Sequence, residues 1–181
     1  MLKYKLTDET KEWRGHTLRK IEYTKEWLES MEVEELEGGW IESEENLTQE
    51  GDACVYGNAR VLGDAQVFGN ARVYGNARVY GNARVLGDAQ VFGNAQVYGN
   101  ACVFGDAQVY GDAWVLGNAQ VYGDACVYGD ARVFGDAQVY GNAWVSQGTT
   151  TTMRIATTER WLEYQHVIAE LQKKWDKEER E

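Results

Sequence analysis

Small, polar and apolar residues alternate with a strict six-residue period along the middle of the chain. Gly recurs every six residues from Gly51 to Gly141 and opens 16 hexads of the form G-[ND]-A-x-V-[YFL], the last of which ends in Ser146. The A-x-V-[YFL] segment alternates with period two, which predicts a short β-strand. The G-[ND] pair predicts a turn, because Gly and Asn or Asp tolerate positive φ. A coil that turns the same way every six residues explains this uniformity.

The pattern V-[YFL]-G-[ND]-A-x resembles the hexapeptide repeat of left-handed parallel β-helix proteins. In that family three hexads form one triangular coil of about 18 residues. The resemblance implies an all-β solenoid, and the expected left-handed winding comes from the resemblance alone. Upstream, Lys3-Tyr4-Lys5-Leu6, Gly38-Gly39-Trp40-Ile41-Glu42 and Asn46-Leu47 look like the N-terminal cap of hexapeptide-repeat proteins from bacteriophages and their bacterial hosts. Many of those proteins carry an acyltransferase label.

The narrow interior of such a coil decides which side of each strand faces inward. Period two places Ala and Val on one side, and the variable residue and the aromatic residue on the other. Tyr and Phe rings from every strand would overfill the interior, whereas Val and Ala side chains fit. We therefore expect Val and Ala at the axis and aromatic rings on the outside.

The segments outside the hexads predict a cap at each end, because a parallel solenoid must block its end coils against further stacking. Leu2–Leu6 and Thr17–Tyr23 predict two strands of a small sheet, and Ile41, Leu47 and Ala53 lie six apart, so the solenoid is expected to start before the first hexad. The expected organisation is an N-terminal α/β cap with an irregular first coil at 1–50, a hexapeptide-repeat β-helix at 51–146, a linker or final edge at 147–156 and a C-terminal amphipathic helix at 157–181.

Apolar residues at alternating three- and four-residue spacing predict that C-terminal helix. Two heptads are too few to indicate a coiled coil. Two roles stay open for the helix: it folds back over the open end of the solenoid, or it joins a helix bundle around an oligomer axis. Its apolar stripe consists of Trp161, Tyr164, Ile168, Leu171 and Trp175.

Outward aromatic residues 18 apart are expected to stack about 4.8 Å apart on three faces. Neighbouring aromatic pairs number 4, 1 and 2 on the three faces. The ladders either only stiffen the solenoid or form an oligomer or partner interface, since an exposed apolar strip of this length usually marks a binding surface. The unbroken face is our candidate interface: Tyr56, Tyr74, Phe92, Tyr110, Tyr128 and finally Trp144.

A second face carries a polar column in which Trp114 stands one coil from Arg132. That spacing brings the indole and the guanidinium within reach of a cation–π contact. We interpret the column as a solvated face with Trp114 as a contact residue. Its members are Arg60, Arg78, Gln96, Trp114 and Arg132.

The charge of the chain is strongly negative and uneven. Its formal net charge is −11, and residues 1–50 hold 14 Asp and Glu against 7 Lys and Arg. This acidity argues against a nucleic-acid partner, which needs a basic stripe. It suits a basic host protein instead. The acidic residues that we assign to partner binding are Glu32, Glu34, Glu35 and Glu37.

The chain shows no apolar run near the ~20 residues that a membrane span needs, and its N-terminus lacks an apolar signal core. The three cysteines, Cys54, Cys102 and Cys126, are an odd number. Their spacing over different coils and faces allows neither a disulfide within the chain nor a metal cluster. We therefore expect a cytoplasmic protein of a bacterial host.

Catalytic chemistry finds little support in the residue pattern. Hexapeptide acyltransferases usually need a solenoid or loop histidine as general base, whereas the two histidines here, His16 and His166, lie in the cap and the tail. Asp88, Asp106 and Asp124 stack at one corner, where they are turn formers or, as the alternative, ligands of a cation. We expect no cofactor and no metal.

The sequence thus predicts a non-enzymatic β-solenoid scaffold or binding protein of phage type, acting through its aromatic faces and end caps. A homo-oligomer, dimer or trimer, is the expected assembly. The first alternative is a phage inhibitor that captures a host defence protein or a small ligand. The second, less favoured because the hexads contain no histidine, is a hexapeptide acyltransferase.

Overall fold

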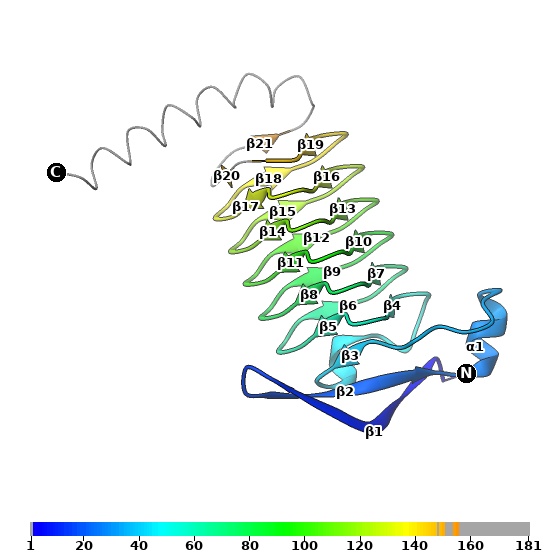
Figure 1. Ribbon diagram of the computed structural model, residues 1–181. Coiled ribbons are helices and arrows are strands. Elements are labelled where there is room, and N and C mark those ends of the chain that lie inside the picture. The colour runs from blue at the N-terminus through cyan, green and yellow to red at the C-terminus, as the bar shows by residue number, and fades with distance from the viewer. Residues whose placement is uncertain (1, 148, 151–153, 156–181) are drawn as a thin grey trace.

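The computed structural model describes residues 2–147, 149–150 and 154–155 as a parallel β-solenoid that stands on an N-terminal cap (Figure 1). Three sheets form its walls, and paired residues such as Gln90 and Gln108 lie one coil apart. The six-residue period therefore predicts this architecture correctly. The hand of the winding stays a prediction from the resemblance.

Each wall is one sheet, and we name the three walls after what lies on their outer side. The hairpin face comprises β1 (Tyr4–Trp13), β2 (His16–Tyr23), β3 (Trp40–Ile41), β5 (Arg60–Val61), β8 (Arg78–Val79), β11 (Gln96–Val97), β14 (Trp114–Val115), β17 (Arg132–Val133) and β20 (Thr149–Thr150). The ladder face comprises β4 (Cys54–Val55), β7 (Arg72–Val73), β10 (Gln90–Val91), β13 (Gln108–Val109), β16 (Cys126–Val127) and β19 (Trp144–Val145). The groove face comprises β6 (Gln66–Val67), β9 (Arg84–Val85), β12 (Cys102–Val103), β15 (Gln120–Val121), β18 (Gln138–Val139) and β21 (Arg154–Ile155).

The core is a column of Ala and Val side chains along the axis. From Ala53 to Val145 every hexad Ala and Val is between 0% and 1% exposed. Most aromatic rings of the hexads, by contrast, are half-buried on the outer surface. The expected inward and outward sides are therefore confirmed. The physical reason is the short strand, whose two sides alternate strictly between axis and solvent.

Glycine is required at the turns for two reasons. The glycines that open the hexads all have positive φ, between 61° and 74°. At Gly87, for example, a Cβ atom would lie 3.1 Å from the backbone nitrogen of Gly105 in the next coil. Any other residue would therefore meet both backbone strain and a contact with the stacked turn.

The cap sheet continues directly into the hairpin face. β1 and β2 form an antiparallel hairpin, and β3 pairs antiparallel with β2 and parallel with β5. Trp40 pairs with Arg60, and this first coil is longer than the regular coil that joins Arg60 to its own partner, Arg78. The first coil therefore begins before Gly51 and differs in length from the regular coils. The first strand runs to Trp13, well past the expected Leu2–Leu6, because its hairpin turn lies at Arg14 and Gly15.

Three side chains of the cap form hydrogen bonds with backbone groups at the lower edge of the first coil. Tyr23 Oη donates to Val55 O at 2.9 Å and accepts from Val55 N at 2.7 Å. Asn46, in the 3₁₀ helix η1 (Glu44–Asn46), donates to Gly63 O and Ala65 O at 2.8 and 2.9 Å.

The buried Lys3 adds the third contact, donating to Ala53 O at 2.8 Å. Burial lowers the pKa of Lys3 from 10.5 to about 8. The cap thereby supplies the hydrogen bonds that a preceding coil would otherwise make.

The far end of the solenoid closes with coils that are shorter than the regular ones. Arg132 pairs with Thr149, and Gln138 pairs with Arg154. The predicted tail helix at 157–181, with Trp161, Tyr164, Ile168, Leu171 and Trp175, lies outside the described residues, as does much of 147–156. Among the described helices, α1 (Lys25–Ser30) included, none is long and apolar enough to cross a membrane.

Candidate functional site

The ladder face brings five of the predicted interface residues into one continuous stack. Successive ring centroids lie 4.8 to 5.2 Å apart, and successive ring planes differ by 2° to 12°. In-register parallel strands cause this spacing, because each ring lies directly above the ring one coil below. The stack consists of Tyr56, Tyr74, Phe92, Tyr110 and Tyr128.

Trp144 ends the ladder as predicted but with a different geometry. Its ring meets Tyr128 edge-on, with centroids 6.3 Å apart at 90°. Its side chain takes the variable position of the hexad, so it lies beside the ring column rather than within it. Trp144 is 53% exposed, and it is one of the large apolar side chains that the described surface shows to solvent.

Burial raises the pKa of Tyr56 to about 12, and it also raises the pKa of Tyr74 and Tyr110. These phenols therefore stay neutral over the physiological pH range. The hairpin face and the groove face have shorter ring stacks, with one pair, Tyr80 and Tyr98, and two pairs around Tyr122. The predicted pair numbers for the three faces are confirmed.

Trp114 lies on the hairpin face and is therefore separate from the ladder. Its ring meets Tyr98 edge-on at 6.3 Å, and Arg132 Cζ lies 4.9 Å from the Trp114 ring centroid. The predicted cation–π contact is confirmed.

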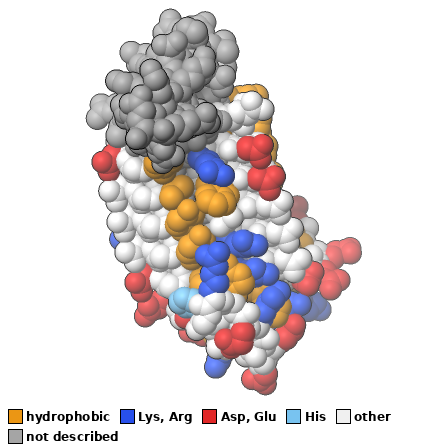
Figure 2. All heavy atoms as spheres, turned by 60° about the vertical axis from the view of Figure 1, so that its left-hand side comes forward, with side chains coloured by type: hydrophobic (Ala, Val, Ile, Leu, Met, Phe, Trp, Pro, Cys, Tyr) orange, Lys and Arg blue, Asp and Glu red, His pale blue; other side chains and the backbone are white. Residues whose placement is uncertain are grey.

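Lower on the hairpin face, next to the cap, lies a cluster of cations and aromatic rings that was not foreseen from the sequence. The hairpin turn carries Trp13 over the outer side of β5 and β8, where its ring meets Tyr80 at 5.8 Å. Arg60 Cζ and Arg78 Cζ lie 5.9 and 5.8 Å from the Trp13 ring centroid, and Arg14 Cζ lies 4.8 Å from it. Figure 2 shows basic side chains gathered beside a hydrophobic band on this side of the molecule.

One sequence signal for this cluster existed. Arg60 and Arg78 occupy the same hexad position one coil apart, which placed two like charges side by side. Nothing local indicated that Trp13 and Arg14, which come far earlier in the chain, would pack on them.

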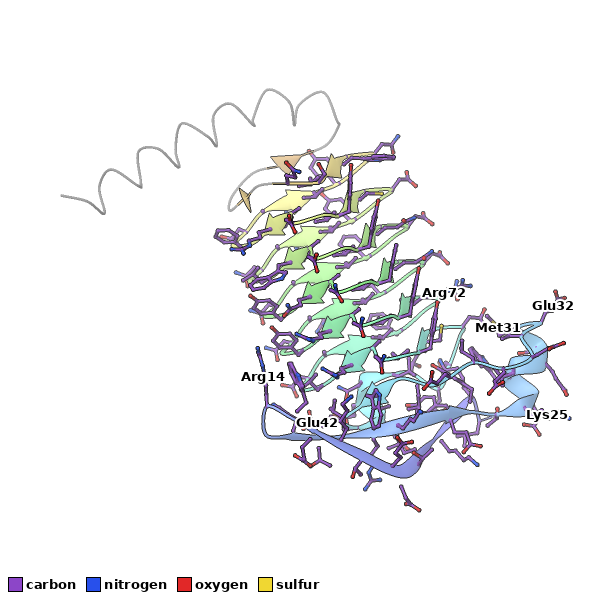
Figure 3. All side chains as sticks on the ribbon, viewed as in Figure 1. Arg14, Lys25, Met31, Glu32, Glu42 and Arg72 are labelled. Carbon is purple, nitrogen blue, oxygen red and sulfur yellow. The ribbon has the colours of Figure 1, made fainter. Side chains whose placement is uncertain are left out.

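The acidic residues assigned to partner binding lie on the loop after α1, across the cap from the hairpin turn. Figure 3 places Glu32 and Arg14 at opposite sides of the cap. All four of these side chains are exposed, and Glu37 also forms an ion pair with Lys20 at 3.1 Å. The loop ends at the base of the ladder face, where Gly57 N donates to Glu37 O.

The groove face carries an open depression of about 500 Å³. Strand and turn residues of three successive coils line it: Asp64, Gln66, Asn82, Arg84, Asn100 and Cys102. The lining is polar and mixed in charge. The structure therefore shows a shallow polar surface here rather than an enclosed pocket.

The remaining candidate residues have structural surroundings. His16 Nδ1 lies 2.9 Å from Glu42 Oε1, while Gly63 N donates to Glu42 Oε2 at 2.7 Å. Burial acts to raise the pKa of Glu42, but the hydrogen bonds from Gly63 and His16 outweigh it and lower that pKa. His166 lies outside the described residues.

The three cysteines are free thiols in the described part of the chain. Burial raises the pKa of Cys54 to about 11 and also raises that of Cys126, so neither is poised as a thiolate. At the Asp88 corner, Asn70 Nδ2 donates to Asp88 Oδ1 at 2.9 Å, which is a ladder contact between turns. Among the described residues no acidic, His or Cys group has the arrangement of a metal site.

Comparison with known families agrees with this geometry. Six segments match the family model described as YdcK beta solenoid repeat, namely residues 53–67, 65–79, 77–93, 95–111, 107–123 and 137–150. The chain is a β-solenoid repeat protein. The matched segments lie in the hexads and just beyond them, so the likeness concerns the solenoid and leaves the cap aside. No curated protein matches the chain.

Proposed function

We propose that this β-solenoid is a non-enzymatic scaffold that assembles with a second copy of itself through the ladder face. The observation that carries the proposal is the unbroken stack of five rings, which ends beside the exposed Trp144. Rigid aromatic surfaces with few charges are typical of the centre of protein interfaces. A dimer related by a two-fold axis is the simplest assembly, and a trimer is the alternative.

The charge distribution favours a second copy as the occupant. Among the outward strand residues of the ladder face, all of them described, Arg72 is the only charged one; the others in its column are Cys54, Gln90, Gln108, Cys126 and Trp144. Two copies with a net charge of −11 each repel one another, and this repulsion is weakest where uncharged strand residues of both copies meet. Six strands make this face about 24 Å long.

A two-fold axis through the middle of the face would place Gln90 and Gln108 of the two copies near each other. The test is a Gln90→Arg, Gln108→Arg variant, in which four guanidiniums would meet across the axis. The fold should tolerate the change, because other hexads already carry an arginine at this position, as at Arg72 and Arg84. We expect sedimentation velocity to show an oligomer for the unchanged protein and a monomer for this variant.

The matched control is Gln120→Arg with Gln138→Arg, the same exchange on the groove face. It should sediment like the unchanged protein. An unchanged protein that is monomeric at all concentrations, or a control that dissociates equally, contradicts the proposal.

A second function, capture of a basic protein partner, is favoured by the acidic loop. Glu32, Glu34 and Glu35 are exposed together beside Val33, which is 37% exposed. A basic peptide such as hexalysine is the probe, and isothermal titration at low and high salt is the measurement. Binding should weaken in Glu34→Gln, Glu35→Gln and persist in the control Glu44→Gln, Glu45→Gln. Equal loss in both variants would indicate only the general acidity of the cap.

A further inference from the structure

The hairpin face holds positive charge that the rest of the described structure leaves unbalanced. Arg60 and Arg78 are direct partners in the register of β5 and β8, so their side chains leave neighbouring strands about 4.8 Å apart. Within the described residues, neither guanidinium has a carboxylate at ion-pair distance, and the same holds for Arg14. Stacked like charges without a counter-ion are unfavourable.

Two buried hydrogen-bond donors mark the same place. The Nε atoms of Arg60 and Arg78 are both buried and have no hydrogen-bond partner in the described structure. Buried donors in native proteins are normally satisfied, and an orphaned pair points to an absent partner such as an ion. Burial, and then the charge of Arg78, lower the pKa of Arg60.

The surroundings keep this patch positive although the whole chain is acidic. Of the turns that flank β5 and β8, three carry a neutral side chain at Asn58, Asn76 or Asn82, and the fourth carries Asp64, which makes no ion pair with Arg60 among the described residues. Glu42, the nearby acid of the same face, is already held by Gly63 and His16. Lys11 Nζ adds a further cation, 5.2 Å from the Trp40 ring centroid.

The outer edges of aromatic rings continue from the cations along the face. Tyr80 contacts Trp13 edge-on and stacks on Tyr98, with centroids 4.8 Å apart. Both tyrosine rings are half-buried, so part of each stays accessible. A ligand with an anionic end and an aromatic end would match this order of cations and rings.

We propose that Arg14, Arg60 and Arg78 bind the phosphate group of an aromatic organic phosphate, of the nucleoside monophosphate class, whose ring contacts the outer edges of Tyr80 and Tyr98. Three cations match a doubly charged phosphate better than a single carboxylate. The planar guanidinium fork also suits bidentate contact with phosphate oxygens. This site is independent of the ladder face, so either proposal can fail alone.

The test is isothermal titration of the full chain with adenosine monophosphate, inorganic phosphate, adenosine and glutamate. We expect adenosine monophosphate to bind tightest, inorganic phosphate more weakly, and adenosine and glutamate not measurably. The variant Arg60→Gln, Arg78→Gln should weaken adenosine monophosphate binding about tenfold or more, since hydrogen bonds to charged groups are lost. The matched control is Arg72→Gln, Arg84→Gln, at the same hexad position on the other two faces, and it should bind unchanged.

Arg14→Gln guards against misfolding, because Arg14 is exposed at the hairpin turn and its loss leaves the core intact. It should weaken binding while the thermal midpoint by circular dichroism stays constant. Failure of both phosphates to bind, equal binding of glutamate, or equal loss in the control variant would each overturn the proposal.

Discussion

The repeat coils and the N-terminal cap are held together in different ways. In the regular coils successive strands repeat the same contacts. These are a backbone hydrogen bond such as Gln90 N to Ala107 O at 2.9 Å, a Val and an Ala at the axis and, except at Ser146 of the last hexad, a ring or Leu outside. In the cap each contact occurs once, as with Tyr23 on Val55 or Asn46 on Gly63.

This difference teaches where single substitutions matter. The energy of the coils is spread over many equivalent contacts, so the loss of one contact is small. In the cap one buried side chain satisfies several backbone groups, so its loss leaves several groups unpaired. Removing one contact should therefore destabilise the coils less than the cap, whereas adding a side chain between stacked turns should destabilise the coils more.

Asn46→Asp should have the largest effect. The side chain of Asn46 is fully buried, accepts from Glu42 N and Ser43 N, and donates to Gly63 O and Ala65 O. A carboxylate there would face two carbonyl oxygens, and the free energy of unfolding should fall by about 3–5 kcal/mol. Urea denaturation measures it.

The control for that change is Asn58→Asp at an exposed turn, where other hexads carry Asp. The free energy of unfolding of this variant should stay within about 0.5 kcal/mol of that of the unchanged protein. If the two variants lose equal stability, the cap is no more sensitive than the coils.

Gly87→Ala should have the second-largest effect. The free energy of unfolding should fall by about 2 kcal/mol, because Ala is strained at positive φ and its Cβ would contact Gly105. Gly15→Ala, at the hairpin turn, is the counterpart in the cap. Gly15 also has positive φ, 84°, but nothing lies within 4 Å of its Cβ position. Its loss should be about 1 kcal/mol. Equal thermal shifts for the two variants would show that coil stacking adds nothing to the backbone strain.

Exchanging an aromatic residue for leucine, or leucine for an aromatic residue, should change the free energy of unfolding by a smaller amount and in opposite directions. Phe92→Leu removes two stacked contacts from the ladder face and should lower the free energy of unfolding by about 1 kcal/mol. Leu86→Phe should raise it by a similar amount at most, because Leu86 stands between Phe68 and Phe104 in the register of the groove face. Chemical denaturation of both variants decides the matter, and shifts of the same sign would contradict ring stacking as the cause.

The smallest effect should come from Glu42 at acid pH, because its side chain is 32% exposed. Its pKa is lowered in the folded protein, so its contribution to stability is present above its ordinary 4.5 and is lost as pH falls through the folded value. Between pH 6 and pH 3, Glu42→Gln should therefore lose less stability than the unchanged protein. The exposed Glu45→Gln is the control and should keep the full acid dependence.

Much of the candidate surface was predictable because it repeats. The stack from Tyr56 to Tyr128 and the contact of Trp114 with Arg132 follow from positions one coil apart. The basic cluster was not predictable, because it joins Trp13 to Arg60 and Arg78 over a distance that no periodic pattern covers. The placement of the acidic loop at the base of the ladder face was missed for the same reason.

The sequence by itself determined the solenoid wall, its inward Val and Ala, and the order of rings on each outer face. Because the period is strict, each short strand has one apolar side to bury, and the register between coils follows from the repeat. Only the tertiary structure decided how the cap closes the first coil and where the side chains of Trp13 and Arg14 lie. Those contacts depend on the angle of one hairpin against one wall, and packing of distant residues sets that angle.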